Sequence, residues 1–251
     1  MNSIDYQQIA QWLRDAERAV VFTGAGISTE SGIPDFRSPG GIWTKFRTVY
    51  YDEFMASADA RHEYWHQKSQ GHRDFADAQP NAGHLAIAKW ESEGRVRGVV
   101  TQNIDGLHQL AGSKQVLELH GTAREIQCQD CGARYDAESL VAEFLQTDQV
   151  PQCQQCEKGR LKHATVSFGQ SLPTDVLEQA VEWSQEADLF LAIGSSLVVT
   201  PAADLPVIAK RSGSRLVIVN RDPTPLDDMA DAVIAESIGA ALSEIDRAAD
   251  T

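Results

Sequence analysis

The chain has 251 residues, of which 42% are hydrophobic and 23% are charged, and its formal net charge is −14 at pH 7. This composition is typical of a folded globular protein, and it excludes a collagen-like, coiled-coil or largely disordered chain. The negative charge argues against sequence-independent nucleic-acid binding, because phosphates would be repelled; it is consistent with solubility alone or with cationic, lysine-rich partners.

Helical and strand-like segments alternate along the chain. The sequence predicts a helix at 9–16, a strand at 19–22, a helix at 81–93, strands at 98–100, 116–119 and 188–193, a helix at 201–211 and a strand at 215–219. Continuous apolar runs bounded by turn residues are typical of parallel strands that are covered on both faces. The alternation therefore predicts an α/β fold, with a Rossmann-like doubly wound parallel sheet.

Two stretches interrupt this alternation. Residues 45–79 are aromatic and charged and lack a clear strand, and residues 123–164 contain all the cysteines. We interpret both as insertions that form a smaller lobe, a helical insert together with a ribbon. The larger lobe then comprises 1–44, 80–122 and 165–251, within a single domain 1–251.

Neither a membrane span nor a signal peptide is predicted. No apolar run approaches the roughly 20 residues that a membrane-crossing helix needs. The first 20 residues mix acidic and polar side chains and lack a basic region followed by an apolar one. We therefore expect a cytoplasmic protein without a membrane partner.

The four cysteines form two CxxC pairs, with 21 residues between the pairs. The pairs are Cys128 with Cys131 and Cys153 with Cys156. Four thiolates suit the tetrahedral coordination of Zn²⁺, whereas the alternative is four unliganded thiols. Since four protein ligands leave no open position, the zinc would be structural and would contribute on the order of 10 kcal/mol to the folding of its lobe. A helix is expected at 138–147, inside the gap.

A glycine-rich turn, GAGISTESG at 24–32, follows the first strand. Such a turn lets backbone N–H groups approach a pyrophosphate. The pattern departs from GxGxxG because Thr29 stands at the third glycine position and the next glycine is Gly32, so a tight structural turn is the alternative. No acidic residue clearly ends a second strand about 20 residues later, and ribose recognition must therefore come from elsewhere.

Polar residues also follow four other predicted strands. These are TQNIDGLH at 101–108, His120-Gly121, GSSL at 194–197 and NRD at 220–222. In open α/β sheets, ligands bind beyond the carboxyl ends of the strands. Each ending alone is explained by a turn, or for His120 by a structural histidine, but five together indicate a bound ligand. A histidine at such a place can exchange a proton near neutral pH.

The motifs together resemble the sirtuins, NAD-dependent protein-lysine deacylases. The resemblance runs in order over residues 20–240. It is carried by GAGISTESGIPDFR (24–37), TQNIDGLHQLAG (101–112), ELHG (118–121), the two CxxC pairs, SFGQ (167–170), GSSLVVTPAADLP (194–206) and VNRDPTPLD (219–227). It implies a Rossmann lobe that binds NAD and a zinc-ribbon and helical lobe beside it.

The resemblance also implies roles for individual residues. His120 would be the general base and Asn103 a second catalytic residue, with Gly24, Ala25 and Gly26 at the pyrophosphate and Phe36 shielding the nicotinamide. The cofactor-binding positions implied are Gly24, Ala25, Gly26, Asp35, Phe36, Arg37, Gln102, Asn103, Ile104, Asp105, Gly194, Ser195, Ser196, Asn220, Arg221, Asp222 and Ile238. Asn220 would take over the contact that an acidic residue makes in other dinucleotide folds.

On the substrate side, the resemblance implies that Val166, Phe168 and Gly169 flank the acyl-lysine of a protein or peptide, with strand-like pairing. This chain departs from the family in LKHATVSFGQ (161–170), which puts peptide preference in doubt. Desuccinylase-like members carry a Tyr-x-x-Arg pair that holds an acyl carboxylate, and here Trp65 and Lys68 stand at those positions. Because lysine lacks the bidentate fork of arginine, neutral acyl groups are favoured, acetyl first.

Other functions fit the same NAD site. A mono-ADP-ribosyltransferase or an NAD glycohydrolase would use a different acceptor, and a non-enzymatic NAD-sensing module would use none. The presence of His120 and Asn103 argues against a sensor, which needs no base. The sequence does not identify the protein substrates, the oligomeric state or the regulators.

Overall fold

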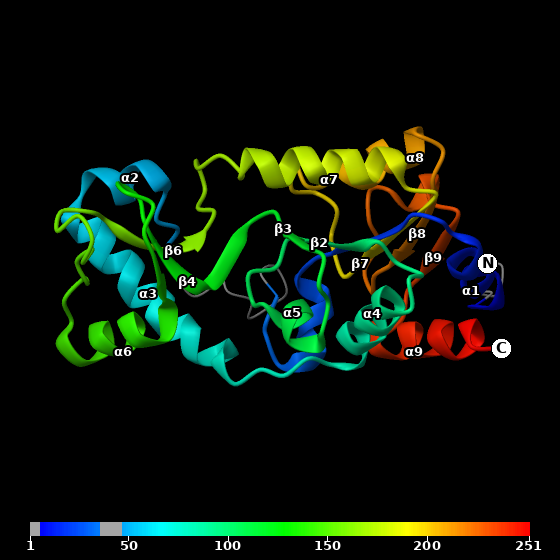
Figure 1. The fold of residues 1–251 in the computed structure, drawn as a ribbon, viewed down its shortest axis with the longest axis horizontal. Helices are drawn as coiled ribbons and strands as arrows, with labels where there is room; N and C mark the ends of the chain where they lie inside the picture. The colour runs from blue at the N-terminus through cyan, green and yellow to red at the C-terminus, as the bar shows by residue number, and fades with distance from the viewer. Residues whose placement is uncertain (1–5, 36–46) are drawn as a thin grey trace.

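The computed structural model describes the backbone of residues 6–35 and 47–251, and among these the side chains of 73–76 are left out. The chain forms a six-stranded sheet and a three-stranded sheet, which lie toward opposite ends of the long axis of the molecule (Figure 1). Among the described helices, none combines the length and the apolar character that a membrane-crossing segment requires.

The larger sheet is wholly parallel, with the order β3-β2-β1-β7-β8-β9. Its strands are β1 (Ala19–Thr23), β2 (Gly98–Thr101), β3 (Val116–Glu118), β7 (Leu189–Ile193), β8 (Arg215–Val219) and β9 (Ala232–Ile234). The chain starts at β1, moves outward to β3 and returns to β7 on the other side of β1. This reversal between β1 and β7 is the point at which ligands bind in doubly wound sheets.

Helices cover both faces of this sheet (Figure 1). Alternate residues of a strand point to opposite faces, so Val21 and Leu191 pack with one set of helices while Phe22 and Phe190 pack with the other. The first face carries α1 (Tyr6–Asp15), α4 (Ala82–Ser92) and α9 (Ile238–Ala249), and the second carries α7 (Thr174–Glu186) and α8 (Asp204–Arg211). The central strands are buried throughout, which explains their continuous apolar runs.

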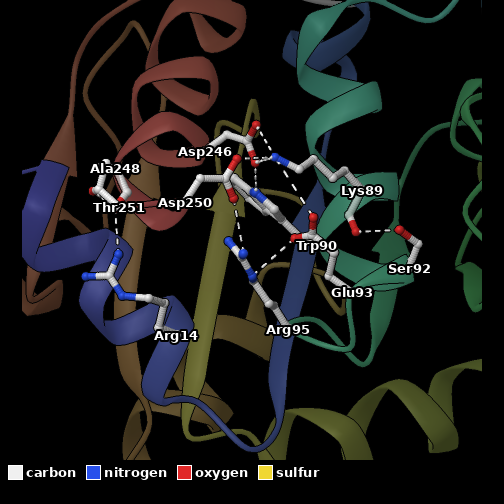
Figure 2. A network of polar contacts seen from close by, with 10 residues as sticks. All are labelled: Arg14, Lys89, Trp90, Ser92, Glu93, Arg95, Asp246, Ala248, Asp250 and Thr251. Carbon is white, nitrogen blue, oxygen red and sulfur yellow. Dashed lines mark hydrogen bonds and ion pairs between the residues drawn. The ribbon is translucent and has the colours of Figure 1, made fainter.

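A polar network fastens the C-terminal helix α9 to α4 (Figure 2). Lys89 of α4 pairs with Asp246 and Asp250 of α9, at 2.9 and 2.7 Å. The indole N–H of Trp90, which is fully buried, donates to Asp246 at 2.8 Å. These contacts hold α9 over the apolar face that it covers.

The smaller sheet is antiparallel, with the order β5-β4-β6. Its strands are β4 (Gly121–Cys128), β5 (Arg134–Asp136) and β6 (Leu161–Thr165), and α2 (Tyr51–Ala56), α3 (Ala58–Ala76) and α6 (Ala137–Thr147) pack around it. A separate core of Phe54, Trp65, Ile126, Phe144 and Leu161 joins these elements. The N-cap Asp136 starts α6 by accepting a hydrogen bond from the Ser139 N–H at 3.1 Å.

The doubly wound parallel fold predicted from the sequence is confirmed. The predicted elements are all present, with ends that differ by a few residues, and α6 fills the gap between the cysteine pairs. The helix α3 lies within the helical insert expected at 45–79, although its bounds were not predicted, and α5 (Leu107–Ala111), α7 and α9 were not predicted. In α3 the buried residues include the neighbours Tyr64 and Trp65, and adjacent positions do not form the single apolar stripe that identifies an amphipathic helix.

Candidate active site

Two loops meet at the reversal point of the large sheet. The turn after β1 leads into a short 3₁₀ helix, η1 (Ala25–Ser31), and the turn after β7 begins at Gly194. The Gly26 N–H donates to the Gly194 carbonyl oxygen at 2.8 Å. A Cβ placed on Gly24 would lie 2.8 Å from the Cβ of Ser195, and one on Gly26 would lie 2.7 Å from the Gly194 oxygen. Both glycines are therefore required for the two loops to touch.

The loop after β2 places two buried polar residues beside η1. The Asn103 side-chain N–H groups donate to the Gly24 carbonyl and to Ser28 Oγ, both at 3.1 Å. Ser28 Oγ in turn donates to Asp105 Oδ2 at 2.7 Å, and the Leu107 N–H donates to Asp105 Oδ1 at 2.9 Å. The amide and the carboxylate are thereby fixed in position before any ligand binds, a pre-organised arrangement.

Gln102 links the third loop to the others. Its Nε2 donates to Ser195 Oγ at 2.8 Å, across 93 positions of sequence. Its backbone oxygen lies 2.9 Å from Nδ1 of His120, just beyond the end of β3. Residues following β1, β2, β3 and β7 are therefore joined by hydrogen bonds at one edge of the sheet.

The His120 imidazole has a defined protonation pattern. Because a carbonyl oxygen only accepts, Nδ1 must carry the proton that bonds to Gln102, which leaves the lone pair on Nε2. Burial lowers the pKa of His120 below the usual 6.5, and the bond to the Gln102 carbonyl partly opposes this shift. At neutral pH the ring is therefore a neutral base with one nitrogen ready to accept a proton.

The segment after β6 runs directly beside this histidine. The Val166 N–H donates to the His120 carbonyl at 2.8 Å. Further along, Phe168 is 48% exposed, and its carbonyl accepts from the Tyr51 N–H at 3.0 Å, which ties the segment to α2. Gly169 has φ +83°, a value that favours glycine. An exposed aromatic side chain therefore stands in the turn after β6, two residues beyond the Val166 contact with His120.

The four cysteine sulfurs converge at the far end of β4. All four Sγ atoms of Cys128, Cys131, Cys153 and Cys156 lie within 4.8 Å of one another. The Sγ pairs 128–156 and 131–153 are 3.8 and 3.6 Å apart. A tetrahedron with Zn–S bonds of about 2.3 Å has S···S edges of about 3.8 Å. The cluster thus fits Zn²⁺ and leaves no coordination position for chemistry.

Comparisons with known proteins agree with this arrangement. A model of the Sir2 family matches residues 24–201. The "NAD-dependent protein deacetylase" of Rhodopseudomonas palustris is 48% identical over 238 residues, 94% of each chain. This chain belongs to the Sir2 family.

Solved structures of the Sir2 family superpose over nearly the whole chain. One, of Sir2 with a p53 peptide and NAD⁺, has a TM-score of 0.88 at 38% identity and covers 96% of this chain and 97% of that one. Another, of Sir2 with a deacetylated p53 peptide and 3′-O-acetyl ADP ribose, has a TM-score of 0.88 at 40% identity, with the same coverage. The sirtuin family and fold expected from the sequence are confirmed.

Several residues that the resemblance singled out lie outside the network just described, or bond within their own loop. Phe36 and Arg37 lie outside the described residues, whereas Asp35 is inside them. Asn220 Nδ2 donates to the Asp222 carbonyl at 2.7 Å, and Arg221 pairs with the Asp222 carboxylate at 3.4 Å. Ala25, Ile104 and Ser196 are half-buried in the loops after β1, β2 and β7.

Ile238 lies beneath the loops at the start of α9. A Cβ placed on Gly194 would lie 2.9 Å from Ile238 Cδ1, and one on Gly83 would lie 3.3 Å from Cγ2. Ile238 is only 7% exposed and belongs to the core under the first face of the sheet.

Three residues that support this site, Ser28, His84 and His108, had no role predicted from the sequence. Ser28 bonds to both Asn103 and Asp105, and its place in the GAGIS string was the available signal. His108 Nε2 lies 2.9 Å from Thr23 Oγ1 beneath the loops, and its ring contacts the His84 ring edge to face at 4.9 Å. Burial lowers the pKa of His84 to about 4 and that of His108 to about 3, so both rings are neutral at pH 7.

The general-base role that the resemblance implies for His120, together with its lowered pKa, predicts the acid limb of the pH profile. A base works only while it is unprotonated, so activity should fall as pH drops through its pKa, and this midpoint should lie below 6.5. The measurement is kcat/KM for an acetylated peptide between pH 5 and 8. A midpoint at or above 6.5 would contradict the assignment. Thermal unfolding at each pH is the control, because His84 and His108 make the fold lose stability as pH falls from 6.5 toward 4.

Proposed function

We propose that this Sir2-family protein is an NAD-dependent protein-lysine deacylase, with acetyl as the preferred acyl group. Its products would be the free lysine, nicotinamide and O-acyl-ADP-ribose. The observation that carries the proposal is the His120 ring, whose Nδ1 is bonded to the Gln102 carbonyl while Nε2 makes no hydrogen bond to the described residues. The names of the relatives and the peptide- and NAD-bound Sir2 structures support it.

The residues at the loops fit NAD chemically. When bound, NAD supplies an anomeric carbon whose leaving group, nicotinamide, is already cationic. Buried amide and carboxylate groups of Asn103 and Asp105 suit ribose hydroxyls and a carboxamide, which need both donors and acceptors. We assign the pyrophosphate to the turn at Gly24–Gly26 and the adenosine end to the loops at 194–196 and 220–222, with Ile238 beneath them and Asp35–Arg37 at the nicotinamide side.

In this proposal His120 transfers a proton, and the segment after β6 holds the peptide substrate. His120 Nε2 takes a proton from a ribose hydroxyl, while the Gln102 carbonyl holds the ring in the required tautomer. Val166 and Gly169 align an extended peptide by backbone pairing. Phe168, exposed at the same segment, covers the acyl-lysine and excludes water that would otherwise capture the sugar.

The preference for a neutral acyl group rests on Trp65 and Lys68. Trp65 is fully buried, and its N–H donates to the Leu161 carbonyl at 2.8 Å, so it has no group to offer a carboxylate. Lys68 Nζ lies 5.8 Å from the centre of the Tyr64 ring, and burial lowers the pKa of its amine. Burial disfavours the charged form of this amine, and the amine lacks the bidentate fork of arginine, so Lys68 is a poor partner for a succinyl carboxylate.

Two further assignments remain part of the proposal. The helical insert 45–79 and the zinc ribbon 123–164 are taken to form a lobe that closes over NAD bound to 1–44, 80–122 and 165–251. The protein is taken to act in the cytoplasm.

The proposal predicts the outcome of incubating the enzyme with a mixed library of acyl-lysine peptides, with and without NAD. Mass spectrometry should show NAD-dependent loss of acetyl groups at least about tenfold faster than loss of succinyl groups, a difference of the size that one missing charged contact produces. Faster desuccinylation would refute the acyl ranking. Mass gain of the peptides by ADP-ribose, or NAD consumption without peptide, would favour the transferase or glycohydrolase alternatives instead.

A further inference from the structure

The loop that carries Asn103 and Asp105 is held from two sides. Their side chains bond toward η1, as described above, whereas the backbone of the loop bonds to β4 of the smaller sheet. The Ala123 N–H donates to the Ile104 carbonyl at 2.9 Å. Arg124 Nε donates to the Asp105 carbonyl at 2.7 Å. A strand of the second sheet therefore fixes the backbone of a loop that belongs to the first.

The Arg124 side chain is fitted to this loop. Gly106 has φ +72°, and a Cβ placed on it would lie 2.5 Å from Arg124 Nε and 2.8 Å from its Cδ. The Arg124 side chain thus occupies space beside the backbone that a Cβ at position 106 would fill. Among the described residues Arg124 makes no ion pair, while its neighbour Glu125 pairs with Arg134. The charge of Arg124 is therefore directed at a backbone carbonyl of the loop rather than at a carboxylate.

We propose that Arg124 is a positioning residue for the cofactor site, acting through the Asp105 carbonyl to place Asn103 and Asp105. The proposal rests on the proposed function, since it assumes that these two side chains contact NAD. It also gives β4 a second role. The strand runs from Gly121, next to His120, to Cys128, a cysteine of the zinc cluster. One strand therefore carries both a cysteine of the cluster and the arginine that bonds to the loop.

The first test is Arg124→Met, which keeps the aliphatic stem against Gly106 but removes the donor to Asp105. We expect KM for NAD to rise, or kcat/KM for NAD to fall, by roughly 10- to 100-fold, as misplacement of binding groups produces. KM for the acetylated peptide should stay within about twofold, because among the described residues Arg124 hydrogen-bonds to Thr122 and Asp105 and not to the segment after β6. Arg124→Lys, which retains a charged donor, should recover part of the loss. The matched control is Arg134→Met on β5, an exposed arginine with no bond to the loop.

The second variant, Gly106→Ala, tests the same contact from the other side. The added methyl group would displace the Arg124 guanidinium, and the same split between NAD and peptide is expected. Zinc content and melting temperature are measured for every variant. The proposal is overturned if Arg124→Met behaves like Arg134→Met. It is also overturned if both KM values change together with loss of zinc or a lower melting temperature, since Arg124 would then be merely structural.

A failure of the proposed function is distinguishable from a failure of this inference. If the wild-type protein does not deacylate any peptide, calorimetric titration with NAD alone still measures the site. Roughly tenfold weaker NAD binding by Arg124→Met than by Arg134→Met supports the positioning role. Equal affinities overturn it.

Discussion

Replacement of His120 by alanine is expected to lower kcat for deacetylation by about 10²- to 10⁴-fold, the usual contribution of a general base. NAD affinity should change only a few-fold, because Asn103, Asp105 and Ser28 hold one another without the imidazole. Initial rates and calorimetric NAD titration on the same preparation measure both quantities.

A second variant separates the base from its hydrogen bond. His120→Asn offers a side-chain N–H that can reach the Gln102 carbonyl but has no basic nitrogen, so it should be as inactive as His120→Ala. His66→Ala is the matched control, since His66 lies exposed on α3 and bonds only to Gln70 in the described residues. Turnover by His120→Asn within about tenfold of wild type would remove His120 from its assigned role.

Loss of zinc is expected to have an equally large effect by a different route. Cys153 is buried, and the Tyr135 hydroxyl lies 3.1 Å from its Sγ and lowers the pKa of the thiol to about 6, which favours the thiolate that binds metal. Cys153→Ser should release the zinc, and a structural zinc site contributes on the order of 10 kcal/mol to folding. The three-stranded sheet should therefore unfold. Activity should be lost as well, because β4 ends at Cys128 and also bonds to the loop that carries Asn103 and Asp105.

Zinc content by elemental analysis, hydrogen exchange across 121–165 and deacetylation rate measure this prediction together. Gln154→Ser is the matched control, an exposed residue in the same turn whose replacement introduces the same side chain. A Cys153→Ser protein that lacks zinc but keeps the protection of β4 and full activity would contradict a structural role for the metal.

The strands of the large sheet, the cysteine cluster and the polar strand endings could be predicted, because each depends on residues that are close together in the sequence. The continuous apolar runs at β1, β7 and β8 predict buried parallel strands, because strands covered on both faces do not alternate apolar and polar residues. The CxxC pairs likewise predict the cysteine cluster from spacing alone. The strand endings at His120 and Asn103 were predictable for the same reason, because parallel strands bring their carboxyl ends to one edge.

Contacts between distant segments were not predictable in this way. From the sequence, Gly24 and Gly26 were expected to let the backbone approach a pyrophosphate. In the structure each glycine also leaves space for the loop at Gly194 and Ser195, about 170 positions away. The bond from Arg124 to Asp105 joins the two sheets, and no sequence motif marks it. Such pairings depend on how the sheets are placed in space, which neither periodicity nor spacing encodes.

The central claim is that the acyl group of a lysine ends on the sugar of NAD through the site at His120. The most direct measurement is the product balance of one reaction with acetylated peptide, followed by mass spectrometry and chromatography. The account predicts one nicotinamide and one O-acetyl-ADP-ribose for every lysine freed, and none of these without peptide. This prediction would be contradicted if free acetate and ADP-ribose were the initial products, or if nicotinamide were released at the same rate with and without peptide.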